Sequence, residues 1–339
     1  MGFLISNLCS DAWNGENSRV TRLLPAPKRS LPNEWLRIVL AAVFLSGASV
    51  RAAESGYEIY VSNERSGDVS VIDGATDEVT ATFAVGKRPR GIHCAPDGKH
   101  VYVALSGSPR MAPGVDHERA PADKSADGIG VIDAATKQLT TKLSAGSDPE
   151  QFALTKDGKS AVIANEDQAT ASIVDLANGK LTGDVKVADE PEGVAVNPAN
   201  GQVYVTCEEN GEVYVIEPEH AFSPAHFKVG ARPRSAAFLP DGSRAYVPSE
   251  AEASISVVDT AANKVIAQIK AEGMPMGAVV SPDGKELYVT NGRGNSVLVI
   301  DTKANAVVTK IEVGERVWGL ALSPDGSKLY TANGASNDV

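Results

Sequence analysis

The sequence is poor in positive charge and in cysteine. It has 32 lysine and arginine residues against 43 aspartate and glutamate residues, a formal net charge of −11. Nucleic acid is therefore not expected as a main partner, because phosphate binding needs a basic face. Of the three cysteines, Cys9 lies near the start, and Cys94 and Cys207 lie far apart without a CxxC motif. The latter two are expected to be buried free thiols, with a disulfide between them as the alternative.

Motifs of common catalytic sites are absent as well. The sequence contains no G-x-S-x-G nucleophile elbow, no H-E-x-x-H zinc motif and no C-x-x-C-H haem-attachment motif. These absences argue against the usual hydrolases, zinc enzymes and c-type haem proteins. An enzyme of another kind would have to use acid and base groups such as Glu150, Glu192 and His117.

No hydrophobic run is long enough to cross a membrane. Residues 38–50 are apolar or small and follow three basic residues, but a membrane span needs about 20 residues. A basic region, a short apolar core and small residues at the −3 and −1 positions of a cut after Ala52 are typical of a secretory signal peptide. We therefore expect a signal peptide and leader over residues 1–52 and a periplasmic domain over residues 53–339.

What the sequence does contain is a repeat of 42 residues. Each copy has a strand such as LYVTN (287–291), a second strand ending in V-x-V-I-D, a third strand, and then a proline that opens a fourth strand. The prolines lie 42 residues apart, except for an interval of 60 residues between Pro89 and Pro149, which places an 18-residue insertion within residues 106–127. Four short strands with period-two alternation in a unit of this length predict a blade of an all-β propeller.

Most repeated residues have expected structural roles. The Pro-Asp-Gly segments predict tight turns, because proline presets φ, aspartate bonds its own backbone and glycine adopts positive φ. They lie at 96–98, 240–242, 282–284 and 324–326. The aspartate that ends V-x-V-I-D is expected to cap the following turn rather than to act in catalysis. It recurs at Asp73, Asp133, Asp175, Asp259 and Asp301.

These motifs resemble the YVTN β-propeller repeat family, and YVTN itself stands at 288–291. The resemblance covers about residues 56–339. Within that family, the segments SNERSGDVSVID, GKRPRGI and the insertion resemble the exported propellers associated with alcohol catabolism that depends on the quinone cofactor PQQ. The resemblance implies seven blades, a periplasmic setting and no established catalytic activity.

The first and last copies are incomplete. The first copy begins at its second strand, near Glu58, and the last stops after its second strand, at 329–333. We expect a seven-bladed ring with a truncated last blade. The alternative is a six-bladed closure in which residues 318–323 lie beside the first copy.

Departures from the repeat mark candidate binding residues. The loops that join outer to inner strands and second to third strands are expected on one face, here called the upper face. Directly after the repeat proline, at the mouth of the central channel, the copies differ in charge and size: Arg90, Glu150, Glu192, Arg234, Met276 and Trp318. Directly after the second strand, four copies carry a glutamate: Glu64, Glu166, Glu208 and Glu250. The insertion begins at the same position and is expected to fold over the mouth as a lid.

The favoured function is that of a non-enzymatic periplasmic binding or docking protein, accessory to a quinoprotein alcohol dehydrogenase. The arc of glutamates would attract a basic partner such as a c-type cytochrome. Arg90, Arg234 and Trp318 would suit a small ligand such as a quinone carboxylate. The plainer alternative is that the arginines pair with Glu150 and Glu192.

Two other classes of protein stay open. One is a lactonase or hydrolase at the channel mouth, and the other is a propeller that holds haem or a metal. Neither PQQ nor haem is expected to be required. His93 is expected to be packed or to line the pore, His220 and His226 to be exposed, and residues 116–118 to diverge too much to clamp a metal ion.

An open ring should be only moderately stable, because unpaired strand edges invite association with other chains. We predict that the isolated chain without its leader melts below about 70 °C, as mesophilic domains do. A single sharp calorimetric transition above that temperature would contradict the open ring.

Overall fold

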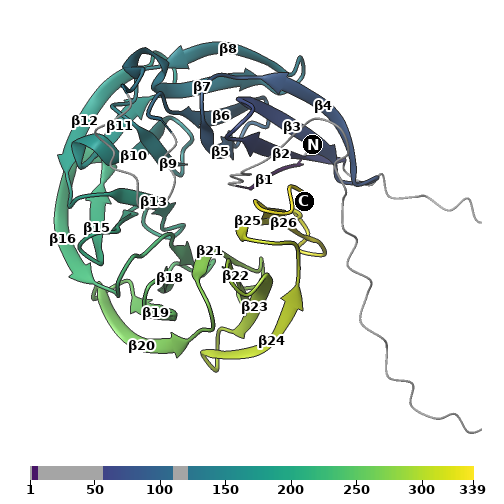
Figure 1. Ribbon diagram of the computed structural model, residues 1–339. Helices are drawn as coiled ribbons and strands as arrows, with labels where there is room; N and C mark the ends of the chain where they lie inside the picture. The colour runs from purple at the N-terminus through teal and green to yellow at the C-terminus, as the bar shows by residue number, and fades with distance from the viewer. Residues whose placement is uncertain (1, 7–55, 110–120) are drawn as a thin grey trace, which may run out of the picture.

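The computed structural model describes residues 2–6, 56–109 and 121–339. The strands form sheets around a central opening, with one strand of each sheet near the opening and the last strand of each complete sheet at the rim (Figure 1). Six sheets have four strands and one has two. The described ranges contain no α-helix, and no helix in them could span a membrane. The prediction of an all-β propeller with four-stranded blades is confirmed.

The blades follow the chain in order. The first three contain β1 (Gly2–Ser6), β2 (Tyr57–Asn63), β3 (Asp68–Asp73) and β4 (Glu78–Ala84); β5 (Pro89–Cys94), β6 (His100–Leu105), β7 (Gly128–Asp133) and β8 (Gln138–Leu143); and β9 (Pro149–Leu154), β10 (Ser160–Asn165), β11 (Thr170–Asp175) and β12 (Lys180–Lys186).

The fourth to sixth blades contain β13 (Pro191–Val196), β14 (Val203–Cys207), β15 (Glu212–Glu217) and β16 (Phe222–Lys228); β17 (Ala237–Phe238), β18 (Arg244–Ser249), β19 (Ser254–Asp259) and β20 (Lys264–Lys270); and β21 (Pro275–Val280), β22 (Glu286–Asn291), β23 (Ser296–Asp301) and β24 (Ala306–Glu312). The two-stranded sheet is β25 (Val317–Leu322) with β26 (Leu329–Asn333). Short 3₁₀ turns occupy η2 (Lys124–Ala126), η3 (Glu166–Gln168) and η4 (Pro218–His220).

The ring has six complete blades, which is the number expected for the six-bladed alternative. The two strands of the last copy form a seventh, incomplete sheet. Beside β2, the inner position of the first blade is occupied by β1, which runs parallel to β2. The sequence pattern had assigned no strand there, since residues 2–6 lie within the predicted leader. The rest of that leader, including the signal peptide, and residues 110–120 of the insertion lie outside the described residues.

The apolar cores lie between neighbouring blades. One cluster combines Tyr60 and Val71 of the first blade with Val101 and Val103 of the second. Strands inside a blade are buried on both faces, whereas the outer strand β4 alternates between exposed and partly buried residues. Each blade therefore buries its apolar side chains chiefly against the next blade.

Glycine permits the inner strands to approach each other. A Cβ atom at Gly193 would lie 2.5 Å from the carbonyl oxygen of Arg234 on the next blade, closer than real contacts allow. The hydroxyl of Thr206 accepts a hydrogen bond from the Gly193 N–H at 2.8 Å. In the sixth blade the Thr290 hydroxyl accepts from the Gly277 N–H at 2.8 Å and donates to the carbonyl of Trp318 on the next sheet.

The predicted turns are confirmed. A carboxylate oxygen of Asp73 accepts the backbone N–H groups of Ala75 and Thr76, both at 2.9 Å. The hydrogen bond from the Thr76 N–H is the main cause that lowers the pKa of Asp73 below its usual value. In the Pro-Asp-Gly turns, Gly98 has a φ of 66°, which favours glycine. Cys94 and Cys207 are free thiols, as expected; Cys207 is buried, whereas Cys94 is half-buried.

The ring was expected to be open because the last copy is incomplete, but its two strands close the ring where β26 meets the first blade. Tyr330 and Ala332 pack against Ile59, Val61 and Ile72. The Tyr330 hydroxyl lies 2.9 Å from that of Tyr57 and donates to Asp77 at 3.1 Å. The seventh sheet thus links the sixth blade to the first through packing and hydrogen bonds.

This contact can be tested by truncation at Tyr330. We predict that Tyr330→Ala lowers the free energy of unfolding by about 3 kcal/mol, because it removes a buried aromatic ring at the closure. Tyr330→Phe keeps the ring and should cost only about 1 kcal/mol through the lost hydrogen bonds. Urea denaturation measures both. Equal losses in the two variants would show that packing of this ring does not hold the closure.

Candidate functional site

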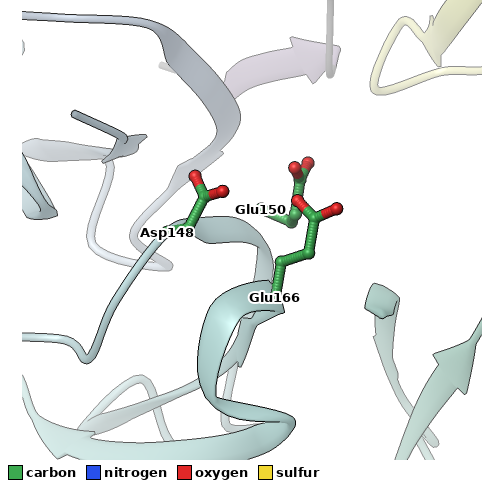
Figure 2. Close-up of side chains that lie close together, drawn as sticks. All are labelled: Asp148, Glu150 and Glu166. Atoms are coloured by element: carbon green, nitrogen blue, oxygen red, sulfur yellow. The ribbon is translucent and has the colours of Figure 1, made fainter. Parts of the chain in front are cut away.

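The structure brings charged side chains of the upper face into two clusters at the channel mouth. In the first, the Arg90 guanidinium forms a short ion pair with Glu150 and lies 3.9 Å from Glu166. Asp148 belongs to the same group and accepts a hydrogen bond from the hydroxyl of Ser106, where the insertion begins. Asp148 lies in the loop before β9, Glu150 on β9 and Glu166 at the start of η3. Their carboxylate groups gather at one place (Figure 2).

The second cluster surrounds Arg234. Its guanidinium lies 3.0 Å from Glu192 and 2.5 Å from Glu250, and it also contacts Glu208. Arg232 forms a further short ion pair with Glu208. The pairing of Arg90 with Glu150 and of Arg234 with Glu192 follows the plainer of the two expectations drawn from the sequence.

The other predicted residues lie near these clusters. Trp318 lies beside Arg234, whose Cζ atom is 5.6 Å from the ring centroid. Met276 is buried, and its carbonyl accepts a hydrogen bond from Ser235 at 2.6 Å. Glu64 forms an ion pair of 2.9 Å with Arg88. The Arg88 guanidinium also donates a hydrogen bond to the carbonyl oxygen of Ser108 in the insertion.

Sequence reasoning missed the residues directly before the repeat proline. Arg88, Asp148 and Arg232 occupy this position, and all three have positive φ, between 41° and 56°. A left-handed backbone costs about 1–2 kcal/mol for a residue other than glycine. The sequence does contain a sign of these residues, because the position before the proline varies in charge between copies in the same way as the position after it.

The clusters carry an excess of negative charge. Seven carboxylates (Glu64, Asp148, Glu150, Glu166, Glu192, Glu208 and Glu250) share four arginines (Arg88, Arg90, Arg232 and Arg234). Burial is the main cause that raises the pKa of Glu208 to about 7, with Glu192 adding to the rise and Arg234 opposing it. Burial likewise raises the pKa of Glu166. Partial protonation of Glu208 near pH 7 lessens the negative charge, but carboxylates still outnumber arginines in these clusters.

One group of carboxylates has the spacing of a cation site. Ligand oxygens of Asp148, Glu150 and Glu166 lie within 4.8 Å of one another, and carboxylates suit hard cations such as Ca²⁺ or Mg²⁺. No metal ligand was predicted from the sequence at these positions. Arg90 already supplies a positive charge to two of the three, so the group is also explained by ion pairing.

The channel below the mouth contains a cavity of about 540 Å³. It is lined by inner-strand residues of six sheets, mostly alanine, valine, leucine and glycine, with His93, Gln151, Glu192 and Arg234 among the few polar groups. His93 lines this cavity, as expected of a residue in the pore. Its ring packs edge-to-face with that of Phe152, with 4.8 Å between the ring centroids. His220 and His226 have exposed side chains, as expected, and His117 lies outside the described residues.

Comparison with known proteins agrees with the fold. The choice-of-anchor I domain matches residues 32–221, more than half of the chain, and a YNCE-like β-propeller matches residues 195–325. A chain of hydrazine synthase from Kuenenia stuttgartiensis has a similar structure, with a TM-score of 0.68 and 21% sequence identity. The match covers 81% of this chain and 88% of that one, and at this identity it shows the fold alone. No curated protein sequence matches the chain.

The raised pKa of Glu208 predicts a pH dependence of stability. Its folded pKa of about 7 lies above its usual value of 4.5, so its stabilising contribution is full below the unfolded pKa and is lost as pH rises through 7. We expect the unfolding free energy of the native chain to fall between pH 5 and pH 8, with Glu208 contributing on the order of 1–3 kcal/mol.

The variant Glu208→Gln should flatten this slope, as measured by urea denaturation across that pH range. Glu209→Gln removes the same charge from the exposed neighbouring residue and should leave the slope unchanged. An unaltered slope in Glu208→Gln would refute the assignment.

Proposed function

Because the chain belongs to the choice-of-anchor I domain family and folds as a β-propeller, we propose that it is a non-enzymatic binding or docking protein whose upper face receives a partner. One observation carries this proposal: in the ion-paired clusters at the channel mouth, seven carboxylates meet four arginines. Complementary charge mainly accelerates association and selects the partner. The partner is therefore a protein with a basic surface.

The ion pairs make a carboxylate ligand a poorer candidate. Arg90 is held by Glu150, and Arg234 is held by three glutamates. A quinone carboxylate such as PQQ would have to displace at least one of these carboxylates. A basic protein would instead add positive charge where it is deficient.

The same pairing argues against catalysis at the mouth. Glu150 and Glu192 were the candidate bases, and each contacts an arginine. A general base needs to reach and accept a substrate proton, and a carboxylate whose oxygens already contact a guanidinium is less available to a substrate. Binding is therefore the better supported role.

The partner that we propose is a quinoprotein dehydrogenase or its c-type cytochrome carrier in the periplasm. This finer proposal rests on the sequence resemblance to exported propellers of PQQ-dependent alcohol catabolism and on the predicted signal peptide. A basic cytochrome would meet the acidic arc of Glu64, Glu166, Glu208 and Glu250.

Association kinetics test the docking role. We expect the double variant Glu64→Gln/Glu166→Gln to bind a purified basic c-type cytochrome several-fold more slowly at low salt, and the native rate to fall steeply with ionic strength. Stopped-flow mixing at two salt concentrations measures both effects.

A matched control is Glu78→Gln/Glu219→Gln. It removes two exposed glutamates from the opposite face, one at the start of the outer strand β4 and one in η4, between the third and outer strands of the fourth blade. It should bind at the native rate. Docking on the upper face is ruled out if the two double variants associate equally fast, or if salt has no effect.

A further inference from the structure

Two neighbouring positions of the channel wall depart from the repeat. At the fifth residue of the inner-strand segment, His93 stands where the other copies carry a small aliphatic residue: Ala153, Ala195, Ala237, Val279 and Ala321. At the third residue, Gln151 stands where four copies carry glycine, at 91, 193, 277 and 319. Both side chains line the cavity of about 540 Å³. The repeat itself does not require either polar group.

Each of these side chains has a buried polar atom without a partner. His93 Nε2 and Gln151 Oε1 make no hydrogen bond to any described residue. Burial lowers the pKa of His93 to about 4 against the opposing effect of the Phe152 backbone, so the ring is neutral near pH 7. In the tautomer that carries its proton on Nδ1, Nε2 of the neutral ring is a hydrogen-bond acceptor.

A buried acceptor without a hydrogen bond costs about 1–3 kcal/mol. Buried polar groups in proteins are therefore normally hydrogen-bonded, to the protein itself or to a bound molecule. Gln151 Oε1 is also an acceptor. The two residues lie on adjacent inner strands, β5 and β9, which contact each other. A molecule that satisfies them must bring a hydrogen-bond donor.

Most of the remaining wall is apolar, and its two charged side chains, Glu192 and Arg234, are paired with each other. It consists largely of aliphatic side chains, including Val194, Val196, Ala278, Val280 and Leu320. Burying a charge there without a counter-ion would be costly. The volume and the small number of polar groups fit the usual description of a small-molecule site.

We propose that the central channel binds a small uncharged organic alcohol, whose hydroxyl donates to His93 Nε2 or Gln151 Oε1 and whose hydrocarbon part lies against the aliphatic wall. This adds a ligand to the binding role proposed above. The two can fail separately, because docking on the upper face depends on salt, whereas the binding of an uncharged alcohol inside the channel does not.

Benzyl alcohol, benzyl methyl ether and benzoate serve as probes for the native chain, with binding followed by titration calorimetry and by the ¹⁵N chemical shift of the His93 ring. We expect benzyl alcohol to bind at one site and to shift the Nε2 resonance. The ether, which lacks the donor, and benzoate, which is charged, should bind at least tenfold more weakly.

The variant His93→Ala installs the residue that four other copies carry, so it is expected to fold, and it should weaken alcohol binding about tenfold. Gln151→Gly likewise installs the repeat residue and should weaken it too. Val279→Ala is the matched control, since it makes a similar truncation at the same level of the wall without removing a polar atom; its affinity should stay within twofold.

The proposal is overturned by equal binding of the alcohol and its ether, by unchanged affinity in both His93→Ala and Gln151→Gly, or by no binding of the alcohol. It is also overturned if a crystal soaked with benzyl alcohol shows only ordered water between His93 and Gln151.

Discussion

Every blade of this protein depends on its neighbours to bury its apolar side chains. Tyr246 of β18, for example, packs in one cluster with Leu287 and Val289 of β22 in the next blade. A four-stranded sheet of this size has two apolar faces, and packing sheets radially covers both of them. Continuity of the ring therefore requires contacts such as those of Tyr330 with the first blade.

Radial packing also accounts for the chemistry of the channel mouth. It gathers the residue after each repeat proline around one axis, where partial burial strengthens charge interactions. The arginines are accordingly drawn to glutamates of the same or the adjacent blade, as Arg234 is to Glu192 and Glu250. Because carboxylates outnumber arginines, the mouth stays acidic, while the wall below it is mostly aliphatic. One ring thus combines a charged upper face with a largely apolar channel.

The alignment of the copies predicted most of the fold and part of the site. Asp73 and Gly98 have the turn roles that their spacing indicates, and the charged residues assigned to the upper face do form clusters there. The strand β1 was missed because residues 2–6 carry no copy of the repeat. Arg88 and Arg232 were not predicted, although the residue before the proline varies in charge between the copies as strongly as the residue after it.

The 42-residue period was sufficient to establish an all-β propeller, its turns and the level at which each variable residue lies, because these follow from local patterning and from the equivalence of the copies. Which charges pair, and whether a polar atom such as His93 Nε2 finds a partner, depended on the tertiary structure alone. Pairing is set by distances of a few ångströms between side chains from different blades, and those distances exist only once the ring has assembled.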